Sequence, residues 1–219
     1  MTEVEEDTKT EFSFDELDER AKQKARDDYI SGDYPGYEWW DYTYEDAVSM
    51  GALIGINIDH RSRKTMSGKI IREPEIQFSG FCSQGDGACF SGDYRFVPDA
   101  VKNIESECND KELLRIATQL TMLQLTRRLT GLAYLSATIT TSGNYSHSGS
   151  MNVNVNSEDN DDEHSNISED VEEDTERLLK GFADWIYKNL EAEYDHLTSD
   201  EYVDERLAEE SFDEDGSVV

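Results

Sequence analysis

Basic residues are scarce in this chain. Its 219 residues include 20 Lys and Arg against 50 Asp and Glu, which gives a formal net charge of −30 at pH 7. A surface that binds DNA or RNA needs Lys and Arg to displace counterions from the phosphates. Direct contact with nucleic acid is therefore disfavoured. Net charge informs about partners and solubility and not about fold, and here it favours a basic macromolecule as the partner.

Cysteines and long apolar runs are also scarce. Cys82, Cys89 and Cys108 have no C-x-x-C spacing, which argues against a disulfide framework and against a thiolate zinc site. No stretch approaches the roughly 18 consecutive apolar residues of a membrane helix. Residues 1–11 lack the basic and then apolar order of a signal peptide. We therefore expect a soluble, cytoplasmic protein.

The acidic residues that are present lie mainly toward the two ends. Residues 1–60 carry 17 acidic and 5 basic side chains, and residues 157–219 carry 24 and 4. Residues 61–156 carry 9 acidic and 11 basic side chains. Aromatic residues make up 10% of the chain, which argues against general disorder. The pattern indicates a nearly neutral, packable body between two acidic flanks.

Apolar spacing predicts an α+β fold. Ser13 and Glu16 have the spacing of a capping box at the start of a helix that ends near Gly32. Residues 109–131 repeat apolar side chains at helical spacing. Alternating segments predict strands at 55–58, 70–82, 89–97, 132–141 and 145–156. We expect an antiparallel sheet of four to five strands with helices packed on one face.

Charge and periodicity divide the chain into five predicted segments. They are a disordered acidic leader at 1–11, an α+β core domain at 12–156, an acidic linker at 157–168, a C-terminal helical segment at 169–210 and a disordered tail at 211–219. The linker is predicted because residues 157–176 include 11 acidic and no basic side chains, which repel one another and keep the first half of this stretch extended. The helical segment opens with an amphipathic helix whose apolar stripe must dock in a groove.

Carboxylates on the first and last helices are the candidate residues for binding a partner, together with two tryptophans. Carboxylates on rigid helices can approximate the spacing of phosphates, because their ordering cost is already met. Trp dominates interface hot spots. The alternatives are a surface that only solubilises the chain and an aromatic loop folded over the core. The candidates are Asp15, Glu16, Asp18, Glu19, Asp27, Asp28, Trp39, Trp40, Glu191, Glu193 and Asp195.

A glycine-rich run at 79–92 is the second candidate site. Glycines allow positive φ and close backbone approach, so the run favours a pocket for a small molecule or a nucleotide. The run is not a P-loop, because the GK[ST] ending is absent. The alternative is an ordinary hairpin turn beside a hydrogen-bonded strand histidine. The candidate pocket residues are Ser83, Gln84, Gly85, Asp86, Gly87 and His147.

Metal and cofactor chemistry is not indicated. His60, His164 and His196 have no H-x-H or H-x-x-x-H spacing with one another or with His147. No G-x-S-x-G elbow or other reaction-specific pattern is present. We therefore predict no cofactor, no metal and no catalytic residue, and we expect a protein that is not an enzyme.

Three runs resemble a family of phage and prophage proteins labelled antitoxin-like, from toxin–antitoxin stability systems. The runs are FSFDELDERAKQKA at 12–25, FSGFCSQGDGACFSG at 78–92 and LSATITTSGNYSHSGSMNV at 135–153. The similarity covers about residues 12–155, and the acidic C-terminal third has no counterpart in it. The resemblance implies a phage or mobile-element setting inside a bacterial cell and the role of an antagonist. It carries over no catalytic residue.

Charge and resemblance together predict a non-enzymatic inhibitor. Its anionic surface would bind a basic toxin or a host defence protein that normally binds nucleic acid, by imitation of DNA. The alternative is a small-molecule or nucleotide-binding protein, with hydrolysis as one activity, that uses the SQGDGA turn and His147. A third reading is an accessory protein whose acidity only keeps it soluble. The oligomeric state has no signal in the sequence.

Overall fold

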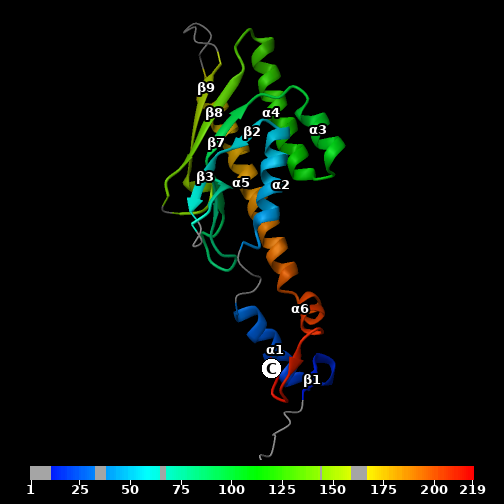
Figure 1. Ribbon diagram of the computed structural model, residues 1–219. Helices are drawn as coiled ribbons and strands as arrows, with labels where there is room; N and C mark the ends of the chain where they lie inside the picture. Colours follow the sequence, from blue (N-terminus) through cyan, green and yellow to red (C-terminus); the bar gives the residue numbers. More distant parts are fainter. Residues whose placement is uncertain (1–10, 33–37, 65–67, 144, 159–166) are drawn as a thin grey trace, which may run out of the picture. The chain divides into compact units, whose positions relative to one another are not determined.

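The computed structural model describes residues 11–32, 38–64, 68–143, 145–158 and 167–219 (Figure 1). These residues form an α+β fold, as predicted. The chain divides into two compact units, residues 1–40 with 192–219 and residues 41–191. We call them the terminal unit and the sheet unit. Parts of both acidic ends of the sequence therefore belong to one unit. The prediction had instead ended the core domain at residue 156 and started a separate helical segment after residue 168.

Four antiparallel strands form the central sheet of the sheet unit, in the order β2, β7, β8, β9. They span Ile56–Ile58, Gly92–Arg95, Leu135–Thr141 and Met151–Ser157. The register places Ile56, Tyr94, Ala137 and Val155 side by side, and all four are buried. This face is covered by helices (Figure 1). The predicted antiparallel sheet with helices on one face is confirmed.

The helices of this unit are α2 (Asp41–Leu53), α3 (Ala100–Glu107), α4 (Lys111–Leu129) and most of α5 (Glu169–Leu197). Helix α5 buries a stripe that includes Leu178, Phe182 and Ile186, as its periodicity predicted. The Phe182 ring meets the ring of Phe90 edge to face, with centroids 5.6 Å apart. The groove that this helix needed is therefore provided by the core of the sheet unit itself.

The predicted strands are shorter than expected, and three of them differ most. The segment 70–82 forms β4 (Ile70–Pro74), which pairs with β3 (His60–Lys64), and β5 (Ile76–Phe78), which pairs with β6 (Ala88–Phe90). The segment 89–97 is divided at Ser91 into β6 and β7. The N–H of Ser91 donates to the carbonyl of Glu75, a residue that lies between two strands. Strand β9 begins only at Met151, because the Ser150 hydroxyl donates to the carbonyls of Tyr145 and His147 and closes a turn there.

The terminal unit joins the two ends of the chain around a small core. Its elements are β1 (Phe12–Ser13), a 3-10 turn η1 (Phe14–Glu16), α1 (Glu19–Ser31), the last turns of α5, α6 (Asp200–Leu207) and β10 (Ser211–Phe212). Strand β1 pairs with β10 in antiparallel register. The buried core consists of Phe14, Leu17, Ala21, Ala25, Val203, Leu207 and Phe212.

Two predictions for this unit are wrong. Residues 211–219 were expected to be disordered, but Phe212 is fully buried, its ring lies 5.9 Å from that of Phe14, and Val219 donates to the carbonyl of Ser211. The predicted capping box exists at Ser13 but caps the η1 turn. Helix α1 begins later, where the Asp18 carboxylate accepts the N–H of Ala21 at 2.8 Å.

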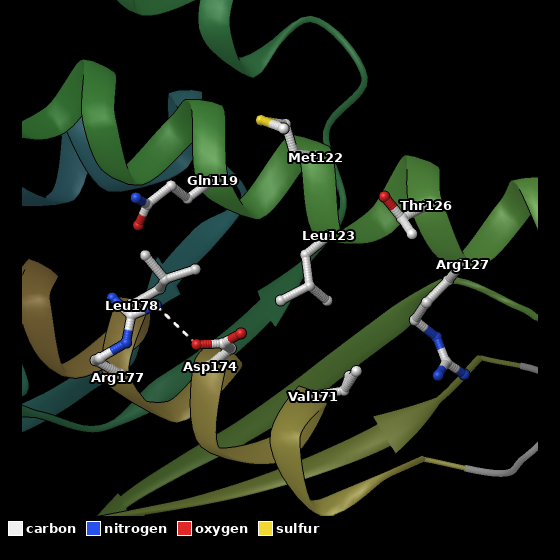
Figure 2. Close-up of a pocket in the computed structure, with 9 residues that line it drawn as sticks. All are labelled: Gln119, Met122, Leu123, Thr126, Arg127, Val171, Asp174, Arg177 and Leu178. Carbon is white, nitrogen blue, oxygen red and sulfur yellow. Dashed lines mark hydrogen bonds and ion pairs between the residues drawn. The ribbon is translucent and has the colours of Figure 1, made fainter.

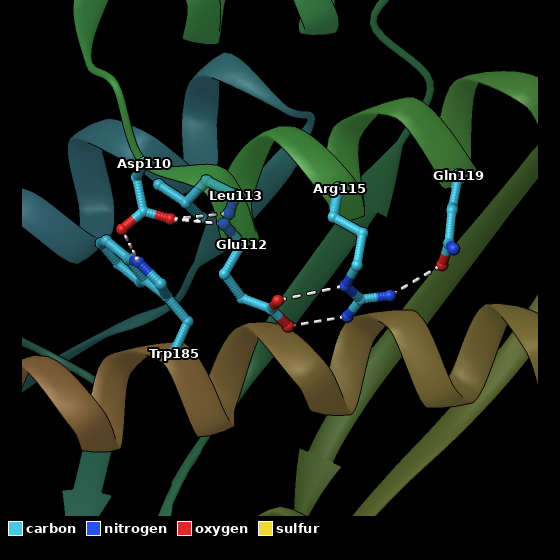
Figure 3. Close-up of polar contacts among 6 residues, drawn as sticks. All are labelled: Asp110, Glu112, Leu113, Arg115, Gln119 and Trp185. Carbon is cyan, nitrogen blue, oxygen red and sulfur yellow. Dashed lines mark hydrogen bonds and ion pairs between the residues drawn. The ribbon is translucent and has the colours of Figure 1, made fainter.

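Helices α4 and α5 run antiparallel along each other. The C-terminal half of α4 and the N-terminal half of α5 line a groove of about 450 Å³ (Figure 2). At the other end of the pair, Asp110 caps α4 through one carboxylate oxygen, which accepts the N–H groups of Glu112 and Leu113 (Figure 3). Its second oxygen accepts the indole N–H of buried Trp185 of α5 at 3.0 Å.

Replacement of Asp110 by alanine is expected to destabilise the sheet unit by about 2 kcal/mol, because it removes a helix cap and leaves the Trp185 N–H without an acceptor. Asp110→Asn keeps a capping oxygen and is expected to cost about half as much. The midpoint of urea unfolding measures both. Asp99→Ala is the matched control, since Asp99 stands at the start of α3 without a side-chain capping bond. An equal loss in Asp99→Ala would contradict the assignment.

Candidate functional site

The terminal unit concentrates the negative charge of the protein. Residues 1–40 and 192–219 carry 24 acidic and 6 basic side chains, a net charge of −18. The sheet unit carries 26 and 14, a net charge of −12 on more than twice as many residues. Since the described part of the terminal unit is built on helices and a strand pair, many of these carboxylates lie on ordered backbone.

The predicted carboxylates of the first helix have different roles. Asp15, Glu19, Asp27 and Asp28 are exposed. Glu16 is bound to the N–H and the hydroxyl of Ser13, both at 2.9 Å. The bond from the backbone N–H of Ser13 is the main reason that the pKa of Glu16 lies below its ordinary value. Glu16 and Asp18 therefore stabilise the local turn and the helix start. The other four are exposed, although Asp27 accepts a hydrogen bond from Gln23 at 2.9 Å, and Glu19 and Asp28 lie 3.9 and 3.8 Å from Lys22 and Lys24.

Ion pairs between the two ends of the chain hold the terminal unit together. Arg26 of α1 donates two hydrogen bonds to Asp204 of α6, at 2.6 and 2.7 Å, and this contact raises the pKa of Arg26. Lys24 lies 3.1 Å from Asp215 of the tail. The N–H of Ser217, and then Lys24, lower the pKa of Asp215 to about 2. Basic residues of α1 are thus used inside the unit.

The carboxylates predicted near the end of α5 are only partly brought together. Glu193 is half-buried and Asp195 is exposed, and both belong to the terminal unit. Glu191 is half-buried and is the last residue of the sheet unit.

Sequence reasoning missed the acidic face of α6 and of the turn after it. The exposed carboxylates there are Asp200, Glu201, Glu205, Glu209 and Glu210. A signal was available, because Ser199 caps this helix by accepting the N–H of Tyr202 and two acidic residues follow it in the first turn. Val203 and Leu207, four residues apart, are the buried positions that dock α6.

The tryptophans predicted as partner anchors are half-buried. The Trp39 ring lies 5.7 Å from that of Trp40 and 5.7 Å from that of Tyr194. Both tryptophans belong to the terminal unit, and residues 33–37 of the aromatic segment lie outside the described residues. The two rings therefore pack within the unit and leave part of their surface accessible.

The glycine-rich turn does meet His147, as the second candidate site requires. A side chain at Gly87 would lie 2.7 Å from the Cβ of His147, so the contact needs glycine. However, the Asp86 carboxylate accepts the N–H groups of Cys82 and Ser83, at 3.0 and 2.7 Å. This carboxylate therefore stabilises its own turn, while Ser83, Gln84 and Gly85 are exposed.

Two cysteines flank this turn, the exposed Cys82 and the buried Cys89, and Cys89 is not an activated nucleophile. Cys89 is fully buried, and burial is the main reason that its pKa is raised. A raised pKa keeps the group protonated, whereas a nucleophilic cysteine needs the thiolate. The arrangement of turn, histidine and thiol therefore has the chemistry of a packed hairpin.

The described residues form neither a metal cluster nor a membrane-spanning helix. In the described ranges, no cluster of three or more His, Cys, Asp or Glu side chains is arranged to hold a metal ion. The described helices include none that is long and apolar enough to cross a membrane.

Comparison with known proteins gives one match. A family model described as "Domain of unknown function (DUF8835)" matches residues 39–200, which is more than half of the chain. The matched range includes the whole sheet unit. No curated protein and no solved structure shows a significant similarity to the chain.

Proposed function

This chain belongs to the DUF8835 family, and we propose that it is a non-enzymatic binding protein whose terminal unit presents carboxylates to a basic protein. The partner is a protein that normally binds nucleic acid, and the carboxylates take the place of phosphates. The observation that supports this proposal is the union of the two chain ends in one unit with a net charge of −18.

Order is what distinguishes this unit from an acidic tail. An acidic segment without structure loses conformational entropy when it binds, whereas carboxylates on a folded unit have already met that cost. The core around Phe14 and Phe212 fixes α1 against α6, and the Arg26–Asp204 pair links the two helices. The exposed carboxylates of α6 are then held at fixed spacing.

We further propose a phage or mobile-element setting, in the cytoplasm of a bacterial host, with an antitoxin-like or anti-defence role. The support is the resemblance of residues 12–155 to antitoxin-like phage proteins together with the charge. The rival reading, a ligand pocket at the glycine-rich turn, has less support because the Asp86 carboxylate is bound to its own turn.

Four substitutions on the acidic face of α6 and its following turn test the proposal: Glu201→Gln, Glu205→Gln, Glu209→Gln and Glu210→Gln. Exposed charge pairs are worth about 0.5 kcal/mol each, so affinity for a basic protein is expected to fall about thirtyfold. Core histone dimers bound to a fluorescent DNA duplex serve as the probe, and displacement of the duplex by the chain gives the affinity. Binding should also weaken steeply with ionic strength.

The matched control removes four exposed carboxylates from the sheet unit, through Glu45→Gln, Asp46→Asn, Glu105→Gln and Glu107→Gln. Both variants have the same net charge. The control is expected to lose about twofold, because distant surface charges are screened. Equal losses would show that only total charge matters, and the terminal unit would then have no role as a binding surface.

A further inference from the structure

Helix α4 exposes an apolar stripe on its outer surface. Met122, Leu125 and Leu129 are 63%, 48% and 88% exposed, and they lie three and four residues apart on one helix face. Single exposed apolar residues are ordinary on a protein surface, but contiguous ones mark interaction sites. The opposite face of α4 is already buried in the core through residues such as Leu113, Ile116 and Leu120. The exposed stripe is therefore a second apolar surface on the same helix.

The stripe borders the groove between α4 and α5. Met122 and Leu123 of α4 and Val171 and Leu178 of α5 give the groove its apolar lining (Figure 2). Its volume of about 450 Å³ is enough for several side chains, and too small for a whole helix. A helix lying along the stripe would insert one row of apolar side chains, the arrangement of helix-in-groove recognition.

The start of α5, next to the groove, is acidic. Glu169–Glu176, the first eight residues of α5, include six carboxylates and no basic residue. The helix dipole stabilises these charges at the helix start, so they alone do not indicate a site. Two of the six are paired with cations of the same helix, Asp174 with Arg177 at 2.8 Å and Glu176 with Lys180. Asp174 is the one that lines the groove, together with Arg177 and the buried Arg127, which donates to the carbonyl of Ala133. The remaining four carboxylates are exposed at the start of α5, beside the groove: Glu169, Asp170, Glu172 and Glu173.

We propose that this groove binds an amphipathic helix of a partner protein, with an apolar stripe flanked by Lys or Arg. The stripe of α4 and the groove lining match the apolar side chains, and the exposed carboxylates at the start of α5 match the basic flank. A second copy of the chain does not fit, because two molecules of net charge −30 repel each other. The site goes beyond the proposed function, since its residues lie outside the terminal unit.

A synthetic helical peptide of about 18 residues tests the site, with Leu along one face and Lys on the flanks. Its affinity for the full chain is measured by fluorescence anisotropy near 0.3 M salt, where long-range charge effects are screened. A peptide with the same composition in scrambled order is the charge-matched reference. The patterned peptide is expected to bind about tenfold more tightly than the scrambled one, because only it buries apolar side chains in the groove.

The double variant Met122→Gln and Leu129→Gln leaves the net charge unchanged and is expected to abolish that tenfold preference. Tyr42→Gln with Ile70→Gln is the matched control, because these side chains are 80% and 71% exposed elsewhere on the sheet unit. The control should retain the preference. The α6 glutamine variant should also retain it, which separates a failure of this site from a failure of the proposed function.

Two results would overturn the site. Equal binding of patterned and scrambled peptides would show attraction by charge only. A dimer of the wild-type chain in light scattering that Met122→Gln with Leu129→Gln dissociates would identify a second copy as the occupant.

Discussion

Replacement of Gly55 by alanine is expected to destabilise the sheet unit by more than about 3 kcal/mol. Gly55 has a φ of +88°, and an added Cβ would lie 1.9 Å from the carbonyl oxygen of Arg95. The carbonyl of Gly55 itself accepts the N–H of Arg95 at 2.9 Å, so the two backbones cannot separate without losing this bond. Urea unfolding followed by far-ultraviolet circular dichroism measures the loss.

Gly131→Ala is the control that separates the steric contact of Gly55 with Arg95 from the cost of a positive φ. Gly131 follows the end of α4 with a φ of +84°, nearly that of Gly55, but an added Cβ there meets nothing within 4 Å. This variant carries only the cost of a left-handed backbone, about 1 kcal/mol. If the two variants lost the same stability, the close approach of Gly55 to Arg95 would not be the cause.

The sheet could be predicted because its signals are local. Alternation of Leu135, Ala137 and Ile139 is visible in the sequence, and these residues are buried on one face of β8. The order of the strands was not predictable in the same way. The pairing of β2 with β7, for example, joins Ile56 to Tyr94, and no short-range pattern specifies that contact.

The terminal unit was missed for a related reason. Phe12 pairs with Phe212 and Lys24 with Asp215, contacts between opposite ends of the chain. The segment 211–219 has only a few apolar residues in an acidic context, so its composition indicated disorder. A single buried phenylalanine and a strand pair are enough to order it, because the other half of the core comes from residues 14–25.

The candidate residues show a further limit of sequence reasoning. Asp15 and Asp18 are both acidic residues near the start of the first helix, but Asp15 is exposed and Asp18 caps α1. Asp86 likewise binds its own turn. A carboxylate that accepts backbone N–H groups and a carboxylate that is exposed to a partner belong to the same residue type in the sequence. Only the geometry separates them.

Phe212→Ala is expected to unfold the terminal unit. Loss of a buried phenylalanine costs about 3–5 kcal/mol, and the hydrophobic core of this unit comprises seven buried side chains among the described residues. Amide hydrogen exchange should show that α1 and α6 lose protection, while β8 and β9 in the sheet unit keep theirs. Val218→Ala is the control, because Val218 is 57% exposed in the same tail. Unchanged protection of α1 and α6 would contradict this account of the core.

The same variant separates order from charge in the proposed function, because Phe212→Ala leaves every carboxylate in place. Ordering a segment on binding costs at least about 2 kcal/mol, so affinity for the histone probe is expected to fall about thirtyfold. This loss of affinity should match that of the α6 glutamine variant, although Phe212→Ala removes no charge and the glutamine variant removes four. If Phe212→Ala unfolds the unit and still binds as the wild type does, the fixed spacing of the carboxylates contributes nothing, and the acidic residues act as a flexible polyanion.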